Sequence, residues 1–222
     1  MRMSDLLEFT SAAAAVRAMN GALLDPTDAW DQLVEGEALL LQRWSGVQAR
    51  VVRSSTQTCA AHPGVIGVCR KQLDGLFGGF QGDEYKTAIF FALAHEFGHL
   101  SQFKVFGPTG ARNRPPREIE AHADILAGVW LGLRLAQGQP HGWDAIMNAA
   151  LQFKIGSANY PSPYQRGVLV NEGRGQADSL IMLESRINVP NYTPLSHGLL
   201  DSDVHDLYNT AVKRLGDTPH TQ

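Results

Sequence analysis

Cysteine is scarce in this sequence. Cys59 and Cys69 are the only two cysteines among 222 residues, which is too few for a disulfide scaffold, and their spacing is not that of a zinc knuckle. Reduced thiols are therefore the default expectation. A single bridge between them is the alternative if the protein is exported.

Long apolar runs and a surplus of charge of one sign are also missing. No stretch approaches the roughly eighteen apolar residues of a membrane span, and the apolar run at residues 12–16 follows two acidic residues and is broken by Arg17, unlike a secretory signal. The net charge is −3 at pH 7, without the basic excess of nucleic-acid-binding proteins. We therefore expect no membrane span, no nucleic-acid partner and a cytoplasmic location.

The composition is that of an ordinary globular protein, with 44% hydrophobic and 18% charged residues. We expect one domain over residues 1–222, with a core at about residues 45–175 to which N-terminal helices and a C-terminal helical tail are appended. Signals weaken beyond Asn171. The apolar spacing predicts helices at residues 3–24, 28–45, 84–103, 118–136, 143–155 and 203–215.

Two short segments, residues 47–53 and Val65-Ile66-Gly67-Val68-Cys69, have β-prone patterns. They predict an α+β fold in which a small mixed sheet with an antiparallel edge strand packs on the helix at 84–103. The second segment is a candidate for the edge that pairs with an extended peptide, although an ordinary sheet strand fits it equally well.

The ends of the helix at residues 84–103 have recognisable signals. Asp83 is a candidate N-cap, and Gly107-Pro108 is expected to end the helix. Residues 109–117 contain glycine, two prolines and three arginines, which indicates an exposed loop. We expect its arginines to be solvated rather than to clamp a substrate.

Two of the expected helices carry motifs for a divalent metal. His95-Glu96-Phe97-Gly98-His99 places two imidazoles one turn apart on one helix face, and Glu120-Ala121-His122-Ala123-Asp124 follows on the next helix. Two histidines and one glutamate are a known ligand set for catalytic zinc, which leaves one position for water. We therefore expect His95, His99 and Glu120 to bind Zn2+.

The neighbours of these ligands have predicted roles of their own. Glu96 projects about 100° around the helix from His95, so it flanks the water instead of the metal and is the expected general base. Asp124 shares a face with Glu120 and is expected to support a ligating histidine, although acids are common on helix surfaces. His122 points to another face and is expected to be a packing or surface residue.

Two further observations bear on the site. A closed structural zinc site is the alternative to a catalytic one, but such a site normally fills its fourth position with Cys or His and has no use for Glu96.

Gly98 costs the helix about 1 kcal/mol relative to alanine. This cost predicts that another element approaches closely at Gly98.

An oxyanion also needs a donor besides the metal. The candidates lie in the downstream half: Tyr160, Tyr164, Arg166 and His197. Tyr160 ranks first, although a tyrosine beside proline is often a turn residue with a solvated hydroxyl. The other histidines have no partner at metal-ligand spacing and are expected at the surface or in the core: His62, His141, His205 and His220.

The chain resembles the bacterial neutral zinc metallopeptidases, within the wider gluzincin group. The resemblance runs from about residue 82 to 130 and is carried by Ala94-His95-Glu96-Phe97-Gly98-His99-Leu100-Ser101-Gln102 and by Glu120-Ala121-His122-Ala123-Asp124-Ile125-Leu126-Ala127-Gly128-Val129-Trp130. It implies a zincin-like fold with His95, His99 and Glu120 as zinc ligands, Glu96 as base and Asp124 as supporting carboxylate.

The chain also departs from that family. Tyr160 stands before Pro161-Ser162, where related peptidases often have a histidine, and Arg166 matches an arginine that follows. Family members commonly have a cysteine after the aspartate of the second motif and an N-terminal membrane anchor. Here Ile125 takes the cysteine's place, and no span is evident.

These features predict a zinc metallopeptidase that hydrolyses peptide bonds through a zinc-activated water, with Glu96 as general base and a peptide or protein as substrate. One alternative is a zinc-binding protein of little or no activity that acts through protein–protein contacts. The other is a hydrolase of a non-peptide amide. Substrate preference and oligomeric state are not predicted.

Overall fold

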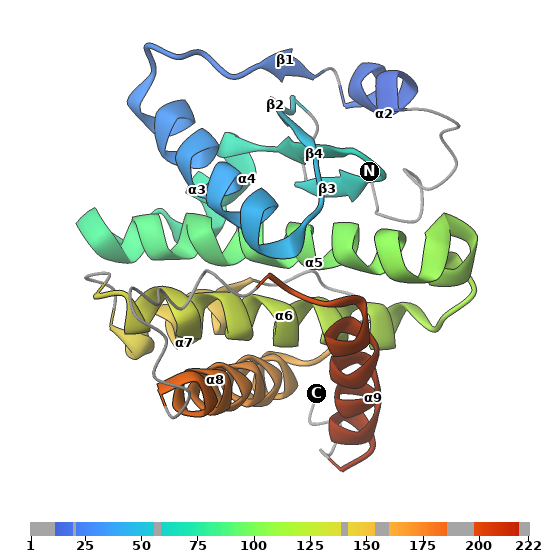
Figure 1. Cartoon of the computed structure of the whole chain (residues 1–222). Coiled ribbons are helices and arrows are strands. Elements are labelled where there is room, and N and C mark those ends of the chain that lie inside the picture. The colour runs from blue at the N-terminus through green and yellow to red at the C-terminus, as the bar shows by residue number, and fades with distance from the viewer. Residues whose placement is uncertain are drawn as a thin grey trace.

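The fold is built around one long buried helix. The computed structural model describes residues 12–19, 21–55, 59–138, 142–153, 160–185 and 198–217. Helix α5 (Gly82–Arg112) crosses the middle of the molecule, with a small sheet and helix α3 (Ala29–Ser45) on one side and helix α6 (Pro116–Ala136) on the other (Figure 1). The expected α+β class is confirmed, and the described chain is mostly helical.

The sheet has four short strands: β1 (Ala22–Leu23), β2 (Arg50–Arg53), β3 (Ala60–His62) and β4 (Val65–Val68). Their order is β1-β2-β4-β3, with β2 and β4 parallel and the other pairs antiparallel, so the sheet is mixed as expected. The two predicted strands are both present.

Of the two interpretations of residues 65–69, the ordinary sheet strand is confirmed and the edge strand is wrong. β4 lies between β2 and β3, and the antiparallel edge strand is β3, in which Ala61 pairs with Ile66. Alanine has low strand propensity, so β3 gave no signal of its own. Gly64, at φ 78°, supplies the left-handed turn that folds β3 back onto β4.

The N-terminal helices differ in how well they were predicted. Helix α2 spans Ala12–Ala18, and residues 22–23 form a strand, so the helix expected to reach residue 24 is too long at its end. Its first nine residues, 3–11, lie outside the described part of the chain. α3 matches its prediction: the Asp28 carboxylate accepts hydrogen bonds from the backbone N–H of Trp30 and Asp31, and Gly46 ends the helix at φ 63°.

Helix α5 is longer than predicted. Gly107, at φ 70° and ψ 158°, kinks the chain, and Pro108 starts a further helical segment that ends at Arg112, because proline is tolerated in the first turn of a helix. The exposed loop expected at residues 109–117 is therefore reduced to residues 113–115. Asp83 lies in the first turn, and the N-cap position is Gln81.

The remaining helices are α4 (Arg70–Phe77), α7 (Trp143–Gln152), α8 (Pro163–Ser185) and α9 (Asp201–Asp217). α7 ends before the predicted residue 155, and α9 is slightly longer than predicted. α4 and α8 were not predicted. The sequence pattern did not predict α8, because three glycines interrupt this helix and its apolar residues do not lie on one face.

One glycine of α8, Gly173, is explained by the contact of this helix with α6. A Cβ at Gly173 would lie 2.1 Å from the carbonyl oxygen of Ile125, and one at Gly128 would lie 2.2 Å from the carbonyl oxygen of Val170. These distances are shorter than any normal contact, so the two backbones meet at a position where side chains cannot fit. Glycine is required there by packing, not by backbone angles.

The main core lies around α5 and α6 and continues into α3 and α9, through residues such as Trp44 and Leu207. α6 is buried on every face from Ile119 to Leu133. Among the described residues, no helix is both long and apolar enough to cross a membrane. Polar residues in the middle of these two helices therefore lie inside protein, and each must find a partner there.

Replacing Gly173 by alanine tests the close approach of α6 and α8. The added methyl group must push the two backbones apart, which costs about 3 kcal/mol and lowers the melting temperature by roughly 6–12 °C. Gly175→Ala is the matched control, because a Cβ there meets nothing within 4 Å and better helix propensity stabilises the chain by about 0.5–1 kcal/mol. Equal melting temperatures for the two variants, measured by calorimetry, would contradict this packing.

Candidate metal centre

The motif residues of α5 lie in the most buried stretch of the molecule. His95 is 0%, Glu96 4% and His99 2% exposed, and Glu120 on α6 is 3% exposed. Ionisable groups in such surroundings are costly unless they are paired or bind a metal. The contacts among these residues therefore show what the site can hold.

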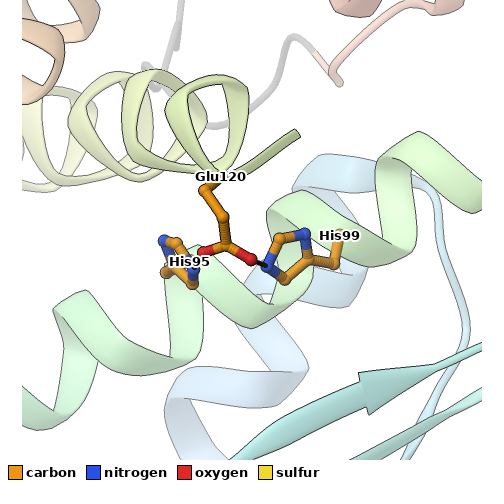
Figure 2. Close-up of side chains that lie close together, drawn as sticks. All are labelled: His95, His99 and Glu120. Carbon is orange, nitrogen blue, oxygen red and sulfur yellow. Dashed lines mark hydrogen bonds and ion pairs between the residues drawn. The ribbon is translucent and has the colours of Figure 1, made fainter. Parts of the chain in front are cut away.

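The two histidines meet Glu120 at the interface of α5 and α6. His95 Nε2 lies 3.2 Å from Glu120 Oε2, and His99 Nε2 lies 3.6 Å from Glu120 Oε1. Figure 2 shows the glutamate reaching from α6 to a position between the two imidazoles. The expected convergence of these three side chains is present.

The other ring nitrogens are held by further side chains. His95 Nδ1 lies 2.9 Å from Asp124 Oδ1, and His99 Nδ1 lies 3.0 Å from Gln102 Oε1. Since both partners accept, each Nδ1 carries the proton. Asp124 makes the kind of contact expected of a supporting carboxylate, and Gln102 is an equivalent residue that the sequence reasoning missed. Its spacing from His99, i to i+3, was the available signal.

The three side chains fit a divalent metal ion. One ligand atom from each of His95, His99 and Glu120 can be chosen so that all three lie within 4.8 Å of one another. A histidine whose Nδ1 carries the proton has a lone pair on Nε2 when it is neutral, and both Nε2 atoms face the carboxylate. Two imidazoles and one carboxylate suit zinc and other first-row divalent ions.

The ionisable ligands have unusual pKa values without a metal. Burial acts to lower the pKa of His95, but hydrogen bonds to Asp124 and Glu120 and their charges outweigh it and raise the pKa to about 9. Burial lowers the pKa of His99 to about 4. Burial acts to raise the pKa of Glu120, but the neighbouring histidines and Arg166 bring it below its ordinary value.

Glu96 is buried between α5 and the sheet edge. Its carboxylate accepts a hydrogen bond from the backbone N–H of Ala61 in β3. Burial raises the pKa of Glu96 to about 7, further supported by the charge of Glu120 and opposed by His95. A carboxyl group that titrates near neutral pH can both accept and return a proton.

Arg166 has a different position from the one expected of an oxyanion donor. Its guanidinium group is 2% exposed, and Nη1 lies 3.2 Å from Asp124 Oδ1. The guanidinium also lies over the Phe153 ring, 5.2 Å from its centroid. Arg166 therefore holds the carboxylate that contacts His95, an ion pair that the sequence reasoning did not foresee.

The other predicted candidates are spread over the chain. Tyr160 is half-buried just before α8, and its role as a donor stays a prediction; Tyr164, in the first turn of α8, is 58% exposed. His197 lies outside the described residues, as do His141 and His220.

The histidines expected not to bind metal lie outside the group formed by His95, His99 and Glu120 where the structure describes them. His122 is fully buried, His62 is buried in β3, and His205 is exposed. Gly98 confirms the expected close approach, since a Cβ there would lie 3.0 Å from the Cα of Ala123 on α6.

Comparisons with known proteins do not identify a family. No protein-family model, no curated protein and no solved structure matches the chain. The case for a function therefore rests on the geometry of the site and on its motifs.

Metal binding is expected to strengthen as the pH rises. In the metal-free protein the pKa of His95 is about 9, so near neutral pH the metal must displace a proton from it. Glu120 is ionised and His99 neutral throughout this range. Between pH 7 and 8.5 the affinity for zinc should rise by up to about tenfold per pH unit, measured by competition with a chelator of known pH dependence. A pH-independent affinity would contradict the protonation of His95.

Proposed function

We propose that the chain is a zinc metallopeptidase, in which His95, His99 and Glu120 hold the metal and Glu96 is the general base. The observation that carries the proposal is that the buried side chains of His95, His99 and Glu120 lie close enough to bind one metal ion. Beside them lies a second carboxylate, that of Glu96, whose pKa is raised. The resemblance of both motifs to the bacterial neutral zinc metallopeptidases supports it. Zinc is proposed because the ligand set is one that zinc hydrolases use.

Glu96 would carry the proton transfers. When bound, zinc supplies Lewis acidity, which polarises a carbonyl and makes water acidic enough to attack near neutral pH. The Glu96 carboxylate takes the proton of the attacking water and passes it to the leaving amine. It is suited to this because its pKa, about 7, is close to that of a zinc-bound water, about 7, and below that of the amine that must be protonated.

The position of β3 favours a peptide over other amides. β3 is the last strand in the sheet order, and Ala61 in this strand donates to Glu96. An extended peptide that pairs with a sheet edge brings its carbonyl groups to a fixed distance from the strand. β3 would therefore align a scissile peptide bond with the base. Tyr160 is proposed as the donor to the oxyanion.

One observation favours a second function. The proposed ligands and base are 4% exposed or less, so little of the site meets solvent, whereas hydrolysis requires that a carbonyl group reach it. A zinc-binding protein that acts through contacts needs no such access. Such a protein would bind zinc and cleave nothing.

Glu96→Gln separates the two functions. The amide cannot accept the proton of water, so we expect hydrolysis of a mixed peptide library to fall by at least about a hundredfold, with about one zinc per chain retained by elemental analysis. Glu84→Gln, an exposed glutamate of the same helix, is the matched control and should keep full activity. Cleavage that survives in Glu96→Gln would refute its role, and zinc without cleavage in the unchanged protein would favour the contact function.

A further inference from the structure

Gln102 is a fully buried amide that connects the two proposed metal-binding helices. It lies on α5, three residues after His99, and is 0% exposed. Its Oε1 lies 3.0 Å from His99 Nδ1, and its Nε2 donates to the carbonyl oxygen of Ile119 over 2.8 Å. Ile119 immediately precedes Glu120. One side chain therefore joins the ring of one proposed ligand to the backbone beside another.

The carbonyl of Ile119 determines which way the amide faces. A carbonyl oxygen can only accept, so the amide nitrogen of Gln102 must point to it and the amide oxygen must point to His99. That oxygen can only accept in turn, so His99 Nδ1 must carry a proton. In the neutral ring the lone pair is then on Nε2, the atom that faces Glu120.

His122 keeps the amide in this orientation. The Nε2 group of Gln102 also lies 3.3 Å from His122 Nδ1. Burial lowers the pKa of His122 to about 3 and keeps the ring neutral, and in the tautomer with the proton on Nε2 its Nδ1 accepts the second N–H of Gln102. The His122 ring is itself enclosed, with the Phe106 ring 6.2 Å and the Tyr208 ring 5.6 Å from it between centroids. The expected packing role of His122 thus has a specific consequence.

We infer that Gln102 is a positioning residue that fixes His99 in the Nδ1–H tautomer and so presents Nε2 to the metal. The inference rests on the proposed metal site but not on hydrolysis. Gln102 does for His99 what Asp124 does for His95, with a neutral group in place of a charged one. Partners of this kind typically change metal affinity by about 10–100-fold when they are removed.

Two substitutions test the inference. Gln102→Met keeps the volume and removes both hydrogen bonds, whereas Gln102→Glu keeps an acceptor for His99 but cannot donate to Ile119. The tautomer of His99 is read in the metal-free protein at pH 8 by long-range proton–nitrogen NMR, with His95, whose pKa of about 9 keeps both ring nitrogens protonated at that pH, as the internal reference for an imidazolium. The zinc dissociation constant is measured by chelator competition, with the exposed Gln48→Met as control variant.

We expect the Nδ1–H tautomer of His99 in the unchanged protein and in Gln102→Glu, and a mixture or the Nε2–H form in Gln102→Met. Zinc affinity should fall about 10–100-fold only in the methionine variant. An unchanged tautomer in Gln102→Met would overturn the inference, as would equal zinc losses in both variants. If the methionine variant does not fold, Gln102→Ala replaces it.

The tautomer also separates this inference from the proposed function. A protein that binds no zinc refutes the metallopeptidase, while the NMR measurement still tests Gln102. Conversely, a zinc site whose His99 tautomer does not depend on Gln102 leaves the metallopeptidase intact and refutes the positioning role.

Discussion

Burial of the polar centre between α5 and α6 is the constraint on which the rest of the structure depends. Charged and polar groups gain nothing from water here, so each must be satisfied by another side chain or by a metal. Asp124 satisfies His95, and Gln102 satisfies His99. The contact between Asp124 and His95 requires that the two helices lie very close together, which Gly98 permits by leaving room for the backbone of Ala123.

Helix α8 connects the proposed metal site with the close backbone contact between α6 and α8. Arg166 and Val170 are one turn apart on α8, and Asp124 and Gly128 are one turn apart on α6. Gly128 lies against the backbone of Val170, and Asp124 pairs with Arg166. The same register therefore sets both contacts. A shift of α8 along α6 would separate Arg166 from Asp124, so the close packing of Gly128 on α6 and Gly173 on α8 also governs the surroundings of His95.

Local patterns were enough to predict the metal ligands and Asp124, although the contact of Gln102 with His99, which also lies within one helix, was missed. The spacing of His95 and His99 fixed their common face, and the spacing of Glu120 and Asp124 fixed theirs. The ion pair between Asp124 and Arg166 could not be predicted, because Arg166 lies on α8, whose apolar pattern is interrupted by glycines and did not predict a helix. β3 was missed for a similar reason: Ala60-Ala61-His62 becomes a strand only because the turn at Gly64 pairs it with β4. Both features depend on contact between segments that are distant in the sequence, and hydrophobic periodicity within one segment does not predict such contacts.

The formal charges of the centre connect the raised pKa of Glu96 with the raised pKa of His95. Without a metal and with Glu96 protonated, Glu120 and Asp124 contribute −2, and Arg166 and protonated His95 contribute +2. A divalent ion that displaces the His95 proton changes the sum by +1, and ionisation of Glu96 restores neutrality. A buried cluster is least costly when its net charge is near zero. The ion would therefore favour the carboxylate form of Glu96, so metal loading and activation of the base would be a single electrostatic event.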